Sequence, residues 1–159
     1  MKIKTLLIIT LLIIGLLNCG TKDEKVTSMN AASRPYYENK ELALEKGDTN
    51  AYDEMSIEFM DSPNDDRFLL TALLMANKHN YGPAYRDVYY CLTDDYHKGN
   101  KSELEDLDKK TRELALKYLI DGADMGNGDC MRILGQLYID GKYLPRDIVK
   151  GNKILKQLE

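Results

Sequence analysis

Small residues recur every four positions in a stretch near the C-terminus, which reads GADMGNGDCMRILGQLYIDGKYLPRDIVKGNKIL over residues 122–155. These small residues are Gly122, Gly126 and Cys130. Residues four apart share one face of a helix, and a glycine between two helical segments favours a tight turn. The spacing therefore predicts two antiparallel helices that approach each other closely at a short connection.

The same pattern of three small residues occurs twice more, earlier in the chain. The two further copies are Ala43, Gly47 and Ala51, and Ala76, Asn80 and Ala84. The last small residues, at 51, 84 and 130, give offsets of 33 and 46 residues, and the longer offset carries an insertion in the region 93–110. Internal repeats of this length are typical of stacked helix pairs.

Apolar residues follow a helical period through almost all of residues 35–159, and no alternating stretch predicts a strand. The run from Phe68 to Ala76 is apolar nearly all round and should form the most buried helix. Ser102 and Glu105 have the spacing of a capping box at the start of a long helix. We expect seven helices, over 35–46, 49–60, 65–77, 82–92, 102–125, 128–140 and 146–159.

With this organisation the chain resembles the Sel1-like repeats, which are relatives of the tetratricopeptide repeats. Two residues of the middle copy depart from the family pattern: Asn80 replaces the turn glycine, and Tyr89 stands where a glycine lets helices touch, so we expect looser or distorted packing there. The third copy matches the pattern best, at Ala123, Gly126, Cys130, Leu134, Gly135, Tyr138, Gly141, Asp147, Lys150 and Gly151.

The resemblance implies an all-α fold. The expected architecture is a short right-handed α-solenoid of about three Sel1-like helix pairs over residues 35–159, with an N-terminal capping helix.

Residues 1–18 have the features of a bacterial lipoprotein signal peptide. Lys2 and Lys4 precede an apolar run over residues 6–17, whose length as a helix is about 18 Å, too short for a hydrocarbon core of roughly 30 Å. The run therefore predicts a cleaved signal rather than a membrane span. It ends in Leu-Leu-Asn-Cys, which resembles a lipobox with Cys19 as the lipid attachment residue; an ordinary secretory signal is the alternative.

Residues 19–34 are polar and predict a flexible tether between the lipid and the folded domain. Loss of Lys2 and Lys4 would leave 20 basic against 26 acidic residues, a net charge of −6. An acidic protein has no electrostatic attraction to nucleic acid. The expected location is the bacterial cell envelope, lipid-anchored at the periplasmic face or the outer membrane.

The sequence shows no catalytic constellation, so we expect no enzyme activity, no cofactor and no metal. Neither His79 nor His97 has a serine, cysteine or carboxylate partner at the spacing of a catalytic site. The two histidines, Cys91 and Cys130 also lack the paired spacing that is typical of metal ligands. An oxidising compartment would permit a disulfide between the two cysteines, although a small buried thiol is the commoner outcome at such apolar helix positions.

The resemblance implies a binding surface on the concave face, built by the first helix of each pair. The positions that would point inward are Asp53, Ile57, Arg86, Tyr90, Arg132 and Gln136. Two arginines and a tyrosine at matching positions would suit an acidic segment of a partner protein, while an ordinary solvated helix face is the alternative.

The leading hypothesis is a lipid-anchored, non-enzymatic protein-binding module. One specific form is an immunity protein that neutralises a secreted toxin, because small Sel1-like lipoproteins resemble periplasmic inhibitors of this kind. The alternatives are an envelope scaffold or adaptor that binds envelope proteins, and an accessory of a cell-wall enzyme.

Overall fold

The computed structural model describes residues 33–61, 67–93 and 103–159. The predicted signal peptide, Cys19, nearly all of the predicted tether and His97 lie outside these residues. The described residues are 81% helical and contain no strand. Their α-helices are α2 (Tyr36–Lys46), α3 (Thr49–Asp61), α4 (Arg67–His79), α5 (Gly82–Thr93), α7 (Lys109–Asp124), α8 (Gly128–Asp140) and α9 (Ile148–Leu155).

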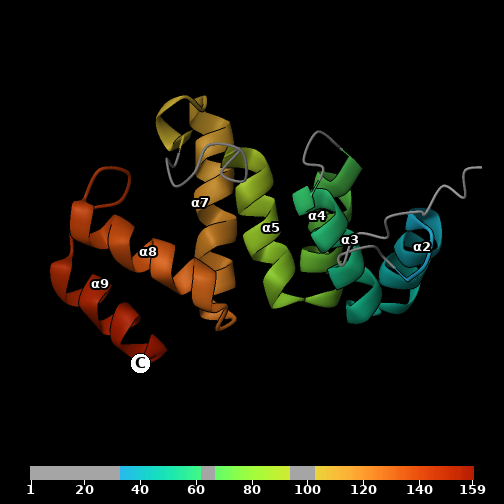
Figure 1. Cartoon of the computed structure of the whole chain (residues 1–159). Helices are drawn as coiled ribbons and strands as arrows, with labels where there is room; N and C mark the ends of the chain where they lie inside the picture. The colour runs from blue at the N-terminus through green and yellow to red at the C-terminus, as the bar shows by residue number, and fades with distance from the viewer. Residues whose placement is uncertain (1–32, 62–66, 94–102) are drawn as a thin grey trace, which may run out of the picture.

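The helices follow one another across the molecule in chain order, from α2 at one end to the α8 and α9 pair at the other (Figure 1). Helices that follow one another pack as neighbouring pairs, which confirms the prediction of an all-α, solenoid-like fold. We refer to α3, α5 and α8 as the A helices and to α4, α7 and α9 as the B helices; α2 precedes the first pair. None of the described helices is long and apolar enough to cross a membrane.

The three predicted turns share one backbone conformation. Gly47, Asn80 and Gly126 each lie just before an A helix, with φ of 67°, 51° and 80°. This left-handed region disfavours most side chains, but glycine adopts it freely and asparagine tolerates it. Asn80 is the one residue other than glycine with positive φ in the described part of the chain, so the middle copy keeps the turn although its sequence departs from the pattern.

Two apolar clusters form the core. Tyr52, Met55, Phe68 and Met75 are almost fully buried in the first cluster, where the ring of Phe68 stacks on Tyr52 and Phe59 with centroids 5.6 and 4.6 Å apart. The second cluster, in the C-terminal half, includes Tyr89, Leu104, Leu116, Leu119 and Leu134. Burial of each large apolar side chain contributes about 1.5–3 kcal/mol.

The expectation that α4 is the most buried helix is wrong, because α5 has six buried residues and no exposed one. Phe68, Ala72 and Met75 are buried, whereas Leu70 is 56% and Leu74 is 39% exposed. Residues 70 and 74 lie one helical turn apart on the side of α4 opposite the core. The apolar residues of this run therefore lie on both the buried side and the exposed side of α4.

Tyr89, which replaces the expected glycine of the middle copy, is buried in the C-terminal core. Its side chain is 1% exposed, and it shares a cluster with Leu104, which is fully buried. Leu104 belongs to a short 3-10 turn, η1 (Glu103–Glu105), in the insertion that precedes α7. The insertion therefore contributes to the part of the core that contains Tyr89.

The long helix predicted from Ser102 begins at Lys109 instead. Ser102 lies outside the described residues, and Glu105 does not serve a capping box there but pairs with Lys142, Nζ to Oε2 2.7 Å. Asp108 caps α7, because its Oδ1 accepts from the backbone N–H of Lys110 at 2.9 Å and of Thr111 at 3.2 Å.

The other predicted helices agree with the structure within two residues at the described ends, apart from the last. Residues Asn127 and Asp147 accept N-cap hydrogen bonds for α8 and α9. Helix α9 ends at Leu155 and is followed by a second 3-10 turn, η2 (Lys156–Leu158).

Candidate binding face on the A helices

The predicted site residues fall at two equivalent positions on the three A helices. The first position, two residues after the last small residue of each copy, holds Asp53, Arg86 and Arg132. The second, one helical turn further along, holds Ile57, Tyr90 and Gln136. We refer to these six residues together as the A-helix face.

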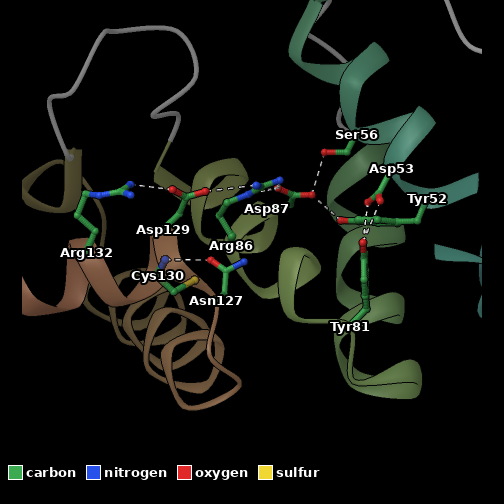
Figure 2. A network of polar contacts seen from close by, with 10 residues as sticks. All are labelled: Tyr52, Asp53, Ser56, Tyr81, Arg86, Asp87, Asn127, Asp129, Cys130 and Arg132. Atoms are coloured by element: carbon green, nitrogen blue, oxygen red, sulfur yellow. Dashed lines mark hydrogen bonds and ion pairs between the residues drawn. The ribbon is translucent and has the colours of Figure 1, made fainter. Parts of the chain in front are cut away.

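A buried carboxylate that sequence reasoning missed lies behind this face. Asp87 on α5 is fully buried, and its Oδ2 accepts hydrogen bonds from the hydroxyls of Tyr52 at 2.9 Å and Ser56 at 3.0 Å on α3. Its Oδ1 binds the Arg86 guanidinium, with Nε at 2.8 Å and NH2 at 2.7 Å. Figure 2 shows that Asp87 thereby joins the first two A helices. The available signal was its spacing of three residues from Ala84, on the buried side of α5.

Arg86 continues this network toward the third A helix (Figure 2). Its NH1 lies 3.4 Å from Asp129 Oδ2, and Arg132 NH1 donates to the other oxygen of Asp129 at 2.8 Å. The Arg86 side chain is 21% exposed, whereas that of Arg132 is 66% exposed. Two arginines that look equivalent in the sequence therefore differ: Arg86 is an internal connector, and Arg132 is accessible.

Asp53 is held by a tyrosine from the turn before α5. The Tyr81 hydroxyl donates to both carboxylate oxygens of Asp53, at 2.9 and 3.0 Å. Partial burial raises the pKa of Asp53, although the Tyr81 hydrogen bond opposes this effect. Burial and the neighbouring carboxylate raise the pKa of Tyr81 to about 12. Tyr81 therefore stays a hydrogen-bond donor through the physiological range.

The second row of the face changes from apolar to polar along the molecule. Ile57 is 39% exposed, and Tyr90 is half-buried with its ring 5.9 Å from that of Tyr89. Gln136 is exposed and donates from Nε2 to Asp140 Oδ1 at 2.7 Å. The face thus presents an apolar, an aromatic and an amide side chain in turn.

Neither described cysteine has the environment of a reactive thiol. Cys91 and Cys130 are free, and burial raises the pKa of each to about 12. A thiol of this pKa stays protonated and is a weak nucleophile at neutral pH. Across the residues that the structure describes, no cluster of three or more histidine, cysteine or acidic side chains could hold a metal ion.

Asp53, Arg86 and Arg132, at equivalent positions of the three A helices, are each held by a hydrogen bond or ion pair within the molecule. Comparison of the chain with protein-family models, curated proteins and solved structures finds no match. Membership of the Sel1-like family therefore stays a prediction.

Proposed function

We propose that this protein is a non-enzymatic binding module that contacts a partner protein through its A-helix face and is held at the bacterial cell envelope by a lipid on Cys19. The observation that carries the proposal is the internal bonding of the face. Asp53, Arg86 and Arg132 occupy equivalent positions, and each is already held by Tyr81, Asp87 or Asp129. Side chains that are ordered before binding lose less entropy when a partner arrives.

The accessible part of the face suits an acidic segment of the partner. Arg132 offers five N–H donors, and Asp129 accepts from one of its nitrogens. Gln136 lies one helical turn away on the same side, and Tyr90 holds the corresponding position on α5. Arginine and tyrosine carry a large share of binding energy in protein interfaces, which makes Arg132 the residue to test first.

Arg86 is a poor probe of binding because of its structural bonds. A glutamate at this position would place a third carboxylate beside Asp87 and Asp129, which Arg86 bridges. The variant would lose stability as well as any contact with the partner.

A cross-linking pull-down from the native envelope tests the proposal with a matched pair of variants. Arg132→Glu changes the A-helix face, and Lys109→Glu makes the same charge change at the start of α7, where the side chain is 86% exposed. We expect Arg132→Glu to lower recovery of the partner about tenfold or more, Lys109→Glu to leave it unchanged, and both to keep the helical circular dichroism of the parent. Equal recovery with both variants would refute the role of the A-helix face.

The identity of the recovered proteins separates the forms of the proposal. An immunity protein would retain one toxin at high affinity, whereas an envelope scaffold would retain several proteins at modest affinity. An accessory of a cell-wall enzyme would retain that enzyme.

The lipid anchor has its own test, since it lies outside the described residues. Radiolabelled palmitate should enter the parent protein but not Cys19→Ser, and the variant should leave the membrane fraction. Persistent labelling of Cys19→Ser would overturn this part of the proposal without affecting the pull-down.

A further inference from the structure

The two ends of the molecule carry exposed faces of opposite charge. Helix α2 lies at one end, and α9 lies beside α8 at the other (Figure 1). At 100° per residue, the side of α2 opposite the buried Asn39 and Ala43 carries Tyr37, Glu38, Glu41 and Glu45. All four are exposed, and Tyr37 is 74% exposed. We refer to these four residues as the α2 end face.

The matching face at the other end is basic and apolar. The side of α9 opposite the buried Gly151 carries Val149, Lys153 and, at the start of η2, Lys156. Val149 is 80% exposed, and Ile148 at the margin is 45% exposed. We refer to Ile148, Val149, Lys153 and Lys156 as the α9 end face.

None of the charged groups on these two faces is engaged within the described residues. The hydrogen bonds and ion pairs of the acidic and basic side chains involve other residues, such as Glu54, Glu105, Lys142 and Lys150. The two end faces therefore keep their charge available for another molecule.

We propose that the α9 end face of one molecule docks on the α2 end face of a second copy of this chain, so that copies associate head to tail. On the α2 end face, the exposed Tyr37 comes before Glu41 and Glu45 in the chain. On the α9 end face, the exposed Val149 likewise comes before Lys153 and Lys156. A parallel alignment of the two helices places Val149 on Tyr37, Lys153 beside Glu41, and Lys156 beside Glu45. An antiparallel alignment would set the valine against a glutamate and a lysine against the tyrosine.

The lengths of the two elements also match. Helix α2 has 11 residues, and α9 with η2 has 8 and 3. A contact between two helices that is only about 16 Å long buries less area than the roughly 1,200–2,000 Å² of a stable interface, so the association is weak and depends on salt. Because the two faces differ, the contact is heterologous, and it generates chains or closed rings of copies rather than a symmetric dimer.

This inference goes beyond the proposed function and uses none of its residues, so either can fail alone. Disulfide trapping of the full-length protein in detergent tests it. The double variant Tyr37→Cys/Val149→Cys should give a ladder of dimers, trimers and longer species on a non-reducing gel after mild oxidation. An equimolar mixture of the two single variants should give dimers only, and each single variant alone should match the parent.

Charge reversals then test the electrostatic part in the same double-cysteine background. We expect Glu41→Lys/Glu45→Lys and Lys153→Glu/Lys156→Glu each to reduce the ladder at least fivefold, and their combination to restore it, because the charges then match again. About 1 M salt, where the Debye length is about 3 Å, should also suppress the ladder. A matched control, Lys109→Cys/Val149→Cys, should give no ladder.

Three results would overturn the proposal. The first is a Tyr37→Cys dimer as strong as the mixed dimer, which would indicate symmetric pairing. The second is a ladder of equal strength in the Lys109→Cys control, which would indicate random collision. The third is failure of the combined charge reversal to restore a ladder that each reversal alone removes.

Discussion

At the scale of single residues, the molecule depends on one carboxylate that is completely removed from water. Asp87 holds two hydroxyls of α3 and the Arg86 guanidinium of α5. A buried charge is tolerated only when it is paired and hydrogen-bonded, and this site meets both conditions. The local sequence around Asp87 does not reveal this arrangement. Its hydroxyl donors, Tyr52 and Ser56, lie 35 and 31 residues earlier in the chain, and only Arg86 is adjacent.

The two arginines of the network should differ in their effect on stability. Arg86→Ala leaves the buried Asp87 charge without its cation, and we expect a loss of about 3 kcal/mol or more in the free energy of unfolding. Arg132→Ala removes an exposed ion pair and should cost less than about 1 kcal/mol. Urea unfolding followed by circular dichroism measures both, and equal losses would show that Asp87 does not depend on Arg86.

Glu54 should make stability depend on pH in the acid range. Hydrogen bonds from Ser33 and Asn39 lower the pKa of Glu54 to about 2 from 4.5. A carboxyl whose pKa is lower in the folded state stabilises the fold above the unfolded value, and this contribution disappears as pH falls from about 4.5 toward 2. Stability measured from pH 2 to 6 should therefore show a difference between the parent and Glu54→Gln that is largest above pH 4.5. A difference that stays constant with pH would contradict this account.

At the scale of elements, the turns and the close helix contacts explain the spacing of small residues. The backbones of α8 and α9 approach so closely that a Cβ on Gly151 would lie 2.6 Å from the carbonyl oxygen of Gly135. A Cβ on Gly135 would lie 2.8 Å from the side chain of Leu155. In the C-terminal pair, where the sequence pattern is clearest, close contact between the helices therefore requires glycine at both positions.

Substitution of these glycines should follow the available space. Gly151→Ala places a methyl group against backbone, and we expect a loss of about 1–3 kcal/mol. Gly128→Ala is the matched control, because its Cβ would meet only the side chain of Leu158, at 3.5 Å, and it should be neutral or slightly stabilising. Thermal unfolding of the two variants gives the comparison, and similar losses for both would contradict the close contact.

Helix ranges could be predicted from the sequence where an apolar period and a turn residue agreed. They could not be predicted in the insertion before α7. There Leu104 turns into the core beside Tyr89, and the Arg112 side chain donates to the carbonyl of Leu107 at 2.7 Å. The Leu104 contact depends on the tertiary fold, and both interactions favour a break where the local pattern of Ser102 and Glu105 favours a continuous helix.

At the scale of the whole molecule, the internal repeat was enough to predict the order of the helices and their packing in neighbouring pairs. The A-helix positions could be predicted too, because equivalent residues of a repeat occupy equivalent places. Their accessibility could not, since it depends on Asp87 and Asp129, which lie outside the repeat pattern. The predicted face therefore separates into Arg86, which joins helices, and Arg132 and Gln136, which are open to a partner.

The most direct test of the proposed binding role is photo-cross-linking in living cells. A photoreactive amino acid replaces Gln136 on the A-helix face, or Lys109 at the start of α7 as the control; both positions are exposed. We predict a discrete covalent adduct with an envelope protein from position 136 and none from position 109. An adduct from position 109 alone, or no adduct from position 136, would contradict the proposal that this protein binds a partner through its A helices.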